Sequence, residues 1–162
     1  MIHNAPETMT PDRKLKAHRL VARFSLITAL LIFAWVGLEY LTGKLFGVPQ
    51  LGPLYGLIPF VIFIGTISAL LLRIRRLHPV IPYWSRVSYG IWMTLLASFM
   101  VVILLLFYYG LMDPSDYEIY EIEVFNIHLR HTLLTSLLGI WTGTVVEGSF
   151  FTLIVAIFVR AK

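Results

Sequence analysis

Four long apolar stretches, separated by short polar segments, make up most of this chain. They cover residues 20–41, 51–72, 87–111 and 132–159. Each is about as long as, or longer than, the roughly 20 residues that a helix needs to cross the hydrocarbon core of a bilayer. The pattern therefore predicts an all-α integral membrane protein, a bundle of four transmembrane helices.

The polar segment before the first apolar stretch is basic. Within residues 1–19, Pro11 and Asp12 favour the start of a helix that continues into the first span. We expect this basic N-terminal segment to be followed by one membrane domain over residues 20–162. In the second span, Pro59 predicts a bend, because proline removes a helical hydrogen bond.

The segment between the third and fourth spans is acidic. Residues 113–131 hold five of the nine acidic side chains, interleaved with tyrosine, isoleucine and phenylalanine. Asp113-Pro114 is a favourable helix start. We therefore expect a short amphipathic helix at the membrane surface rather than a strand.

Composition supports the membrane assignment. Hydrophobic residues make up 58% of the 162 and charged residues only 14%, which leaves little for a separate soluble domain. The chain has no cysteine, which excludes disulfides, thiol catalysis and thiolate metal sites. A net charge of +4 could indicate nucleic acid, but the basic residues are segregated in a way that topology explains better, so we expect no nucleic-acid partner.

The distribution of lysine and arginine predicts the orientation. Eleven of the thirteen flank the spans on one side, and only Lys44 and Arg130 flank them on the other. Positive residues concentrate in the cytoplasm, so both termini are expected inside and the acidic segment outside. The residues expected to anchor the bundle at lipid headgroups are Arg73, Arg75, Arg76, Trp84 and Arg86. The basic N-terminal segment is expected to bind anionic headgroups in the same general way, without a specialised lipid site.

One carboxylate, Glu147, interrupts the fourth apolar stretch. A span of about 20 residues counted back from Arg160 begins near residue 140, so Glu147 lies about 10 Å or more below the outer boundary. Burying an ionised carboxylate there costs at least a few kcal/mol. We therefore expect Glu147 to be neutral, paired, or facing a wet cavity.

Small and polar residues surround Glu147 at helical spacing. We predict one close-packing face, formed by Gly139, Gly143, Thr144, Glu147, Gly148 and Thr152. Hydroxyl groups on the other spans are candidate donors to the carboxyl group: Ser25, Thr28, Thr66, Ser68, Thr94 and Ser98.

Two functional hypotheses follow from Glu147. In the first, the protein is a structural or accessory subunit that packs against a larger membrane complex or a second copy of itself. In the second, it is a homo-oligomeric proton- or cation-coupled carrier or channel, with Glu147 as the coupling carboxylate. The antiparallel arrangement of small four-helix multidrug antiporters requires balanced flanking charge, which this chain lacks.

Other chemistry has little support. His128 and His131 lie three residues apart beside the acidic segment and could contribute to a metal site, although solvated interfacial histidines explain them more simply. The chain has no nucleophile elbow, glycine-rich phosphate loop or HExxH motif. We therefore expect no enzymatic activity and no cofactor.

The second half of the chain, residues 50–162, resembles a family of small bacterial membrane proteins that is known only as a domain of unknown function. The resemblance rests on Tyr89-Gly90, on Tyr108-Tyr109 followed by Asp113-Pro114, and on a glycine-spaced last span with a short basic tail. It implies four spans and the inner membrane of a bacterium, and it adds no activity.

Overall fold

The computed structural model describes residues 10–46, 53–111, 120–124, 127–131 and 133–159. Within them, four helices dominate: α1 (Pro11–Phe46), α2 (Pro53–Leu77), α3 (Tyr83–Leu111) and α4 (Leu133–Phe158). Each contains a stretch of 21 or more residues that is long and apolar enough to cross a membrane. The prediction of four helices that can span a membrane is confirmed at this level.

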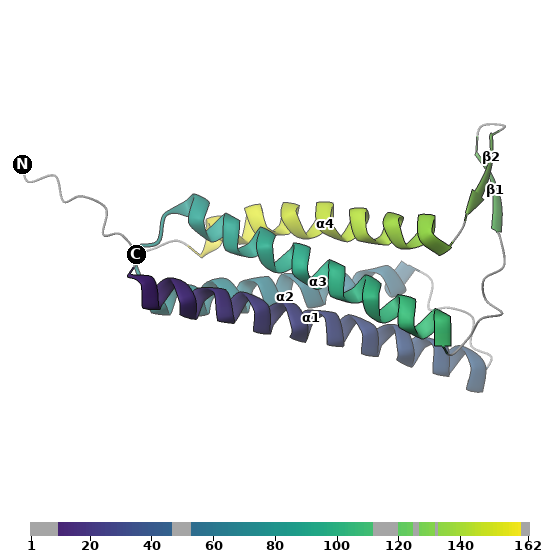
Figure 1. Ribbon diagram of the computed structural model, residues 1–162, viewed down its shortest axis with the longest axis horizontal. Helices are drawn as coiled ribbons and strands as arrows, with labels where there is room; N and C mark the ends of the chain where they lie inside the picture. The colour runs from purple at the N-terminus through teal and green to yellow at the C-terminus, as the bar shows by residue number, and fades with distance from the viewer. Residues whose placement is uncertain (1–9, 47–52, 112–119, 125–126, 132, 160–162) are drawn as a thin grey trace, which may run out of the picture.

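The helices form an antiparallel bundle (Figure 1). α1 and α3 run in one direction and α2 and α4 in the other, so α1 begins at the end of the bundle where α4 finishes. The closest packing is between α1 and α3 and between α3 and α4, whereas the described parts of α1 and α4 do not touch. Around the bundle the order is therefore α1, α2, α4, α3.

The connection between α2 and α3 is shorter than predicted. The spans predicted at 51–72 and 87–111 leave residues 73–86 between them, but α2 continues to Leu77 and α3 starts at Tyr83. Arginine is a good helix former, so the polar residues after the second apolar stretch do not end the helix. Pro79 does, because a proline disfavours helical backbone at the residue before it, here His78.

The expectation of an amphipathic helix between α3 and α4 is wrong. The structure has two antiparallel strands there, β1 (Tyr120–Val124) and β2 (Ile127–His131), with Glu121 opposite Arg130 in the register. Hydrophobic and polar residues alternate through β1 and through residues 127–130 of β2, and a period of two favours a strand over a helix. The hairpin lies at the end of the bundle where α3 finishes and α4 begins (Figure 1).

The core is apolar and centred on α2 and α3. Its largest fully buried hydrophobic side chains are Ile67, Leu70, Leu71, Ile74 and Met93. A buried hydroxyl crosses between two helices: Ser25 Oγ of α1 donates to the Met93 carbonyl of α3 at 3.1 Å, and it also lies 2.8 Å from the Val21 carbonyl. The hydroxyl is thus satisfied within the bundle interior.

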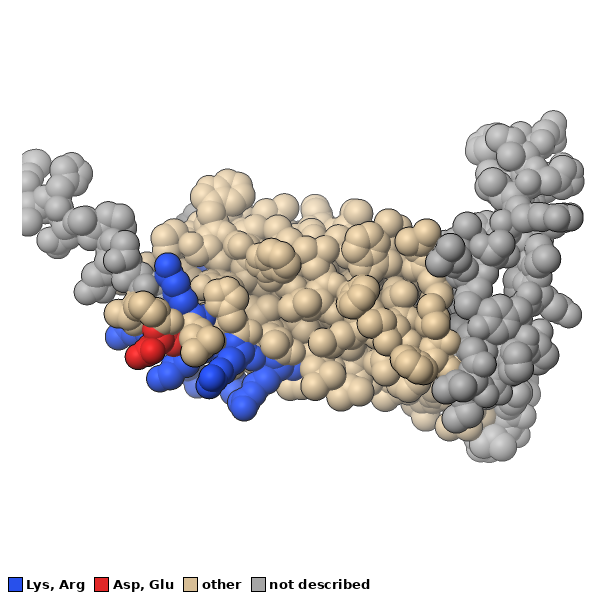
Figure 2. Space-filling model, viewed as in Figure 1, with Lys and Arg blue, Asp and Glu red and all other residues tan. Residues whose placement is uncertain are grey.

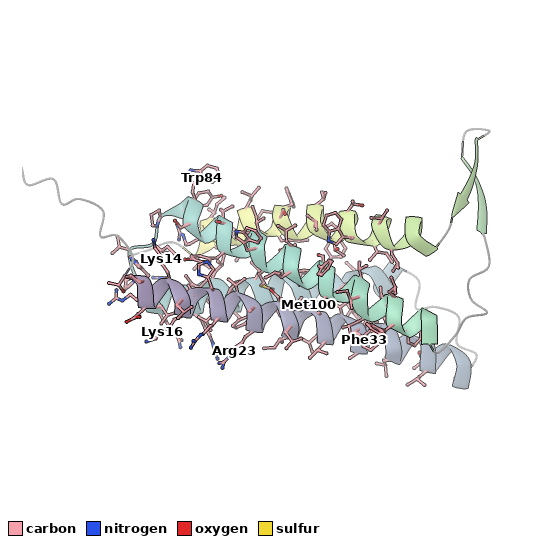
Figure 3. The ribbon with its side chains drawn as sticks, in the orientation of Figure 1. Lys14, Lys16, Arg23, Phe33, Trp84 and Met100 are labelled. Atoms are coloured by element: carbon pink, nitrogen blue, oxygen red, sulfur yellow. The ribbon has the colours of Figure 1, made fainter. Side chains whose placement is uncertain are left out.

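Positive charge gathers at one end of the bundle. In the space-filling view, lysine and arginine cluster where α1 begins, and the long middle part of the visible face carries none (Figure 2). The side chains of Lys14, Lys16 and Arg23 lie at this end, whereas Phe33 and Met100 lie farther along the bundle (Figure 3). Segregated charge of this kind is typical of a spanning bundle.

Candidate functional site

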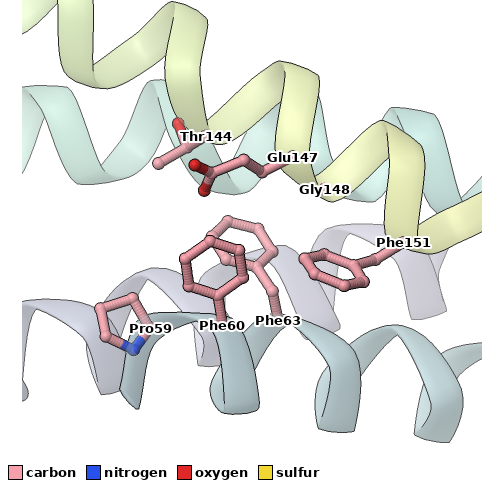
Figure 4. A pocket seen from close by; sticks show the side chains of 7 residues that line it. All are labelled: Pro59, Phe60, Phe63, Thr144, Glu147, Gly148 and Phe151. Carbon is pink, nitrogen blue, oxygen red and sulfur yellow. The ribbon is translucent and has the colours of Figure 1, made fainter. Parts of the chain in front are cut away.

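Glu147 lines a cavity between α2 and α4 of about 230 Å³. The other lining residues are Pro59, Phe60 and Phe63 of α2 and Thr144, Gly148 and Phe151 of α4. Figure 4 shows the carboxylate beside Thr144 and over the rings of Phe60 and Phe63. The site therefore combines one carboxylate with a largely aromatic wall.

Aromatic contacts join the two helices at this cavity. The rings of Phe60 and Phe151 meet edge to face, with their centroids 5.5 Å apart. Such pairs are stabilising because the positive edge of one ring faces the negative face of the other. The two phenylalanines thus fix the distance between α2 and α4 beside Glu147.

The side chain of Glu147 is exposed, although it lines this cavity between α2 and α4. Within the described part of the chain, it has neither a hydrogen bond nor an ion pair. The neighbouring Thr144 hydroxyl is occupied elsewhere, since it donates to the Ile140 and Trp141 carbonyls of its own helix. The described residues therefore leave the carboxylate of Glu147 without a hydrogen-bond partner.

Four of the six hydroxyls proposed as donors to Glu147 bond to backbone carbonyls instead. Thr28, Thr66 and Thr94 each donate to a carbonyl one turn earlier in the same helix, and Ser25 bonds within α1 and to α3. Buried Ser98 Oγ has no partner among the described residues. The expectation that an internal hydroxyl satisfies Glu147 finds no support among the described residues, since none of these hydroxyls donates to the carboxylate.

The predicted small-residue face is divided into two parts. Its buried part is Gly148 and Thr152, which pack on Gly90 and Thr94 of α3. A Cβ atom at Gly148 would lie 2.3 Å from Thr94 Cγ2, and one at Gly90 would lie 2.3 Å from Thr152 Cγ2. Each threonine thus fills the space above a glycine of the opposite helix, and we call these four residues the glycine–threonine contact.

The open part of the face is Gly139 and Gly143. Both are exposed, and a Cβ atom at either would meet no other atom within 4 Å. They lie on the outward side of α4, whereas Glu147, in the same row, also lines the cavity beside α2. The single packing face predicted from the sequence is therefore split, because rows four residues apart on a helix diverge around its circumference.

Sequence reasoning missed the α3 half of the glycine–threonine contact. Gly90 and Thr94 have the same spacing as Gly148 and Thr152, a glycine followed four residues later by threonine. In two antiparallel helices this spacing places each glycine opposite a threonine. The repeated spacing was the signal that could have identified the pair.

The residues predicted to meet lipid headgroups have different environments. Trp84, Arg73 and Arg76 are exposed, and Arg75 is half-buried near the end of α2. Arg86 differs from them: it is 6% exposed, and its Nη1 donates to the Val159 carbonyl at the end of α4. Arg86 therefore contacts the protein rather than lipid, since its guanidinium satisfies a carbonyl that the helix leaves unpaired.

The two candidate metal ligands, His128 and His131, both belong to β2. Their side chains, like those of residues 109–136 generally, lie outside the described part of the structure. Among the described side chains, no group of three histidine, aspartate or glutamate residues could hold a metal. The histidine hypothesis stays a prediction.

The four apolar helices indicate a multi-pass membrane protein. One of these helices, α4, carries an exposed carboxylate within its span. Comparison of this chain with protein families, with characterised proteins and with solved structures gives no match. The resemblance to the small bacterial family thus stays a prediction.

Proposed function

We propose that the protein is a structural or accessory membrane subunit. A helix of a larger complex or of a second copy covers one side of α4, the open face, which is formed by Gly139, Gly143, Val146 and Glu147. The observation that carries the proposal is that Glu147 is exposed on a spanning helix and has no partner among the described residues. Lipid tails offer a carboxyl group no hydrogen bond, which costs at least a few kcal/mol. A partner that supplies a donor removes this cost.

The neighbouring glycines fit the same role. Gly139 and Gly143 are open, and glycines four residues apart allow the backbone of another helix to approach closely. Such close approach stabilises the packing of two helices, whereas contact with lipid chains does not require it. The open face therefore combines two glycines that allow close approach with a carboxylate that has no partner among the described residues.

The orientation that we propose has both termini in the cytoplasm, and the membrane is the inner membrane of a bacterium. The charge segregation supports the orientation. The bacterial membrane follows from the family resemblance only.

The absence of cysteine allows a direct test of the open face. Single-cysteine variants Gly143→Cys and Val146→Cys are labelled with a thiol-reactive benzophenone and irradiated in native membranes. We expect a cross-linked product of twice the mass, if the partner is a second copy, or of a different mass for another protein. Leu30→Cys is the matched control, since it is 50% exposed on α1, diagonally opposite α4.

The proposal fails if the α4 variants give no protein product or give the same products as Leu30→Cys. A second variant tests the polar contribution. Glu147→Gln keeps the hydrogen-bonding shape and should keep the cross-link, whereas Glu147→Leu should weaken it, since leucine offers the partner no polar atom.

A second candidate function is cation transport, and the aromatic wall of the cavity favours it. Three phenylalanine rings and a carboxylate face one cavity, a combination that attracts organic cations through charge and through the ring faces. In proteoliposomes, Glu147→Gln would then abolish proton-coupled uptake of a lipophilic cation and leave assembly unchanged. No uptake by the wild-type protein would reject this candidate.

A further inference from the structure

A second cavity, separate from Glu147, lies at the basic end of the bundle. It measures about 300 Å³ and is lined by Lys16, Arg19, Leu20 and Arg23 of α1 and by Leu77 at the end of α2. Three of its five lining residues carry positive charge. We call it the basic cavity.

The three cations share one face of α1. Their spacing of three and four residues aligns them along the helix over about 10 Å at 1.5 Å per residue. Figure 3 shows Lys16 and Arg23 at the end of the bundle where charge gathers. The cavity therefore runs from the polar end of α1 toward its apolar part.

The positive charges of the basic cavity are not neutralised by the described residues. Lys16, Arg19 and Arg23 form no ion pair there, whereas other arginines of this end are engaged: Arg73 lies over the Phe24 ring at 5.8 Å and Arg86 bonds to Val159. Like charges at this spacing repel one another. An anion between them removes the repulsion and gains charge-assisted hydrogen bonds.

The surroundings of the cavity point to the kind of anion. Two of its lining residues are leucines, and the same face of α1 continues beyond Arg23 with Ile27 and Leu30, which are 46% and 50% exposed. A small soluble anion would contact only the three basic side chains. An anion that carries a hydrocarbon chain would contact both the basic side chains and the apolar surface of α1.

We propose that the basic cavity is a binding site for an anionic phospholipid. Its phosphate lies between Lys16, Arg19 and Arg23, and an acyl chain follows Ile27 and Leu30 along α1. This site differs from the general headgroup anchoring predicted for the basic N-terminal segment and for the arginines after the second span, since it has a defined lining shared by α1 and α2. It is independent of the proposed function, because neither Glu147 nor the open face of α4 contributes to it.

The test is native mass spectrometry of the whole protein in mild detergent, titrated with phosphatidylglycerol or phosphatidylcholine. We expect the wild-type protein to bind phosphatidylglycerol preferentially. In the triple variant Lys16→Gln, Arg19→Gln, Arg23→Gln, the affinity should fall roughly 100-fold, since each basic residue near a lipid surface contributes about 1 kcal/mol.

A charge-matched control separates a site from general attraction. Arg13, Lys14 and Arg76 are exposed and do not line the cavity. Their triple glutamine variant loses the same charge and should change the affinity less than about threefold. Equal losses in the two triple variants overturn the proposal, as does equal binding of the two lipids by the wild-type protein.

A further arm distinguishes lipid from free phosphate. Inorganic phosphate added at millimolar concentration should leave the phosphatidylglycerol adduct in place, because it cannot replace the contacts of the acyl chain. Displacement at that concentration would identify a phosphate site and reject the lipid. Far-ultraviolet circular dichroism and the elution volume in size-exclusion chromatography show whether each variant is folded. If the triple variant does not fold, the single variant Arg19→Gln tests the site, and its affinity for phosphatidylglycerol should fall about fivefold.

Discussion

The glycine–threonine contact between α3 and α4 makes a sharp prediction for Gly148→Ala. The new Cβ atom would lie 2.3 Å from Thr94 Cγ2 and 2.9 Å from Thr94 Oγ1. Carbon atoms pack best at about 3.5–4.0 Å, so one of the helices must move by about 1 Å or Thr94 must rotate. Rotation is unfavourable, because Thr94 is fully buried, β-branched and hydrogen-bonded to the Gly90 carbonyl at 3.0 Å.

The size of the effect follows from this geometry. Overpacking a well-packed interior costs typically about 1–3 kcal/mol, and the small gain in helix propensity from glycine to alanine, about 1 kcal/mol, offsets part of it. We therefore expect Gly148→Ala to destabilise the protein by roughly 1–2 kcal/mol. For a chain of this length that corresponds to a lower apparent Tm by about 2–8 °C.

Thermal unfolding in mild detergent, followed by circular dichroism, measures the change. Gly65→Ala is the control: it lies on α2, a Cβ atom there meets nothing within 4 Å, and its Tm should stay the same or rise. The double variant Gly148→Ala, Thr94→Ala removes the two closest atoms of Thr94 and should recover part of the loss. A wild-type Tm for Gly148→Ala, or no coupling in the double variant, would refute the contact as described.

Two further substitutions test contacts that hold the bundle together. Arg86→Gln should lower stability by about 1–3 kcal/mol, since it removes a charged donor from the Val159 carbonyl at the end of α4, and the same unfolding assay should show almost no change for exposed Arg76→Gln. Ser25→Ala removes the hydroxyl that joins α1 to the Met93 carbonyl and should cost about 0.6 kcal/mol, the usual size for such bonds between membrane helices. A Tm equal to that of the wild-type protein for Arg86→Gln, or a loss of several kcal/mol for Ser25→Ala, would contradict these assignments.

Local pattern misled the sequence reasoning where two periods competed. Asp113-Pro114 favours a helix start, whereas hydrophobic and polar residues alternate on both sides of Phe125, which favours strands. The alternation corresponds to the strands β1 and β2. Pairing between two strands adds backbone hydrogen bonds that a single-segment pattern does not reveal.

The class of protein and the number of spans could be predicted from the sequence, because the length and apolarity of a stretch decide whether it can cross a bilayer. Glu147 also stood out in the sequence as the unusual residue of the last span. The packing of the helices was needed to place it: Gly148 and Thr152 turn toward α3, whereas Glu147, one position before Gly148, lies exposed at the cavity beside α2. The helical period gives the relative angles of these residues, but which side of α4 meets the bundle depends on the matching surface of α3, and that surface belongs to a segment more than 50 residues away in the chain.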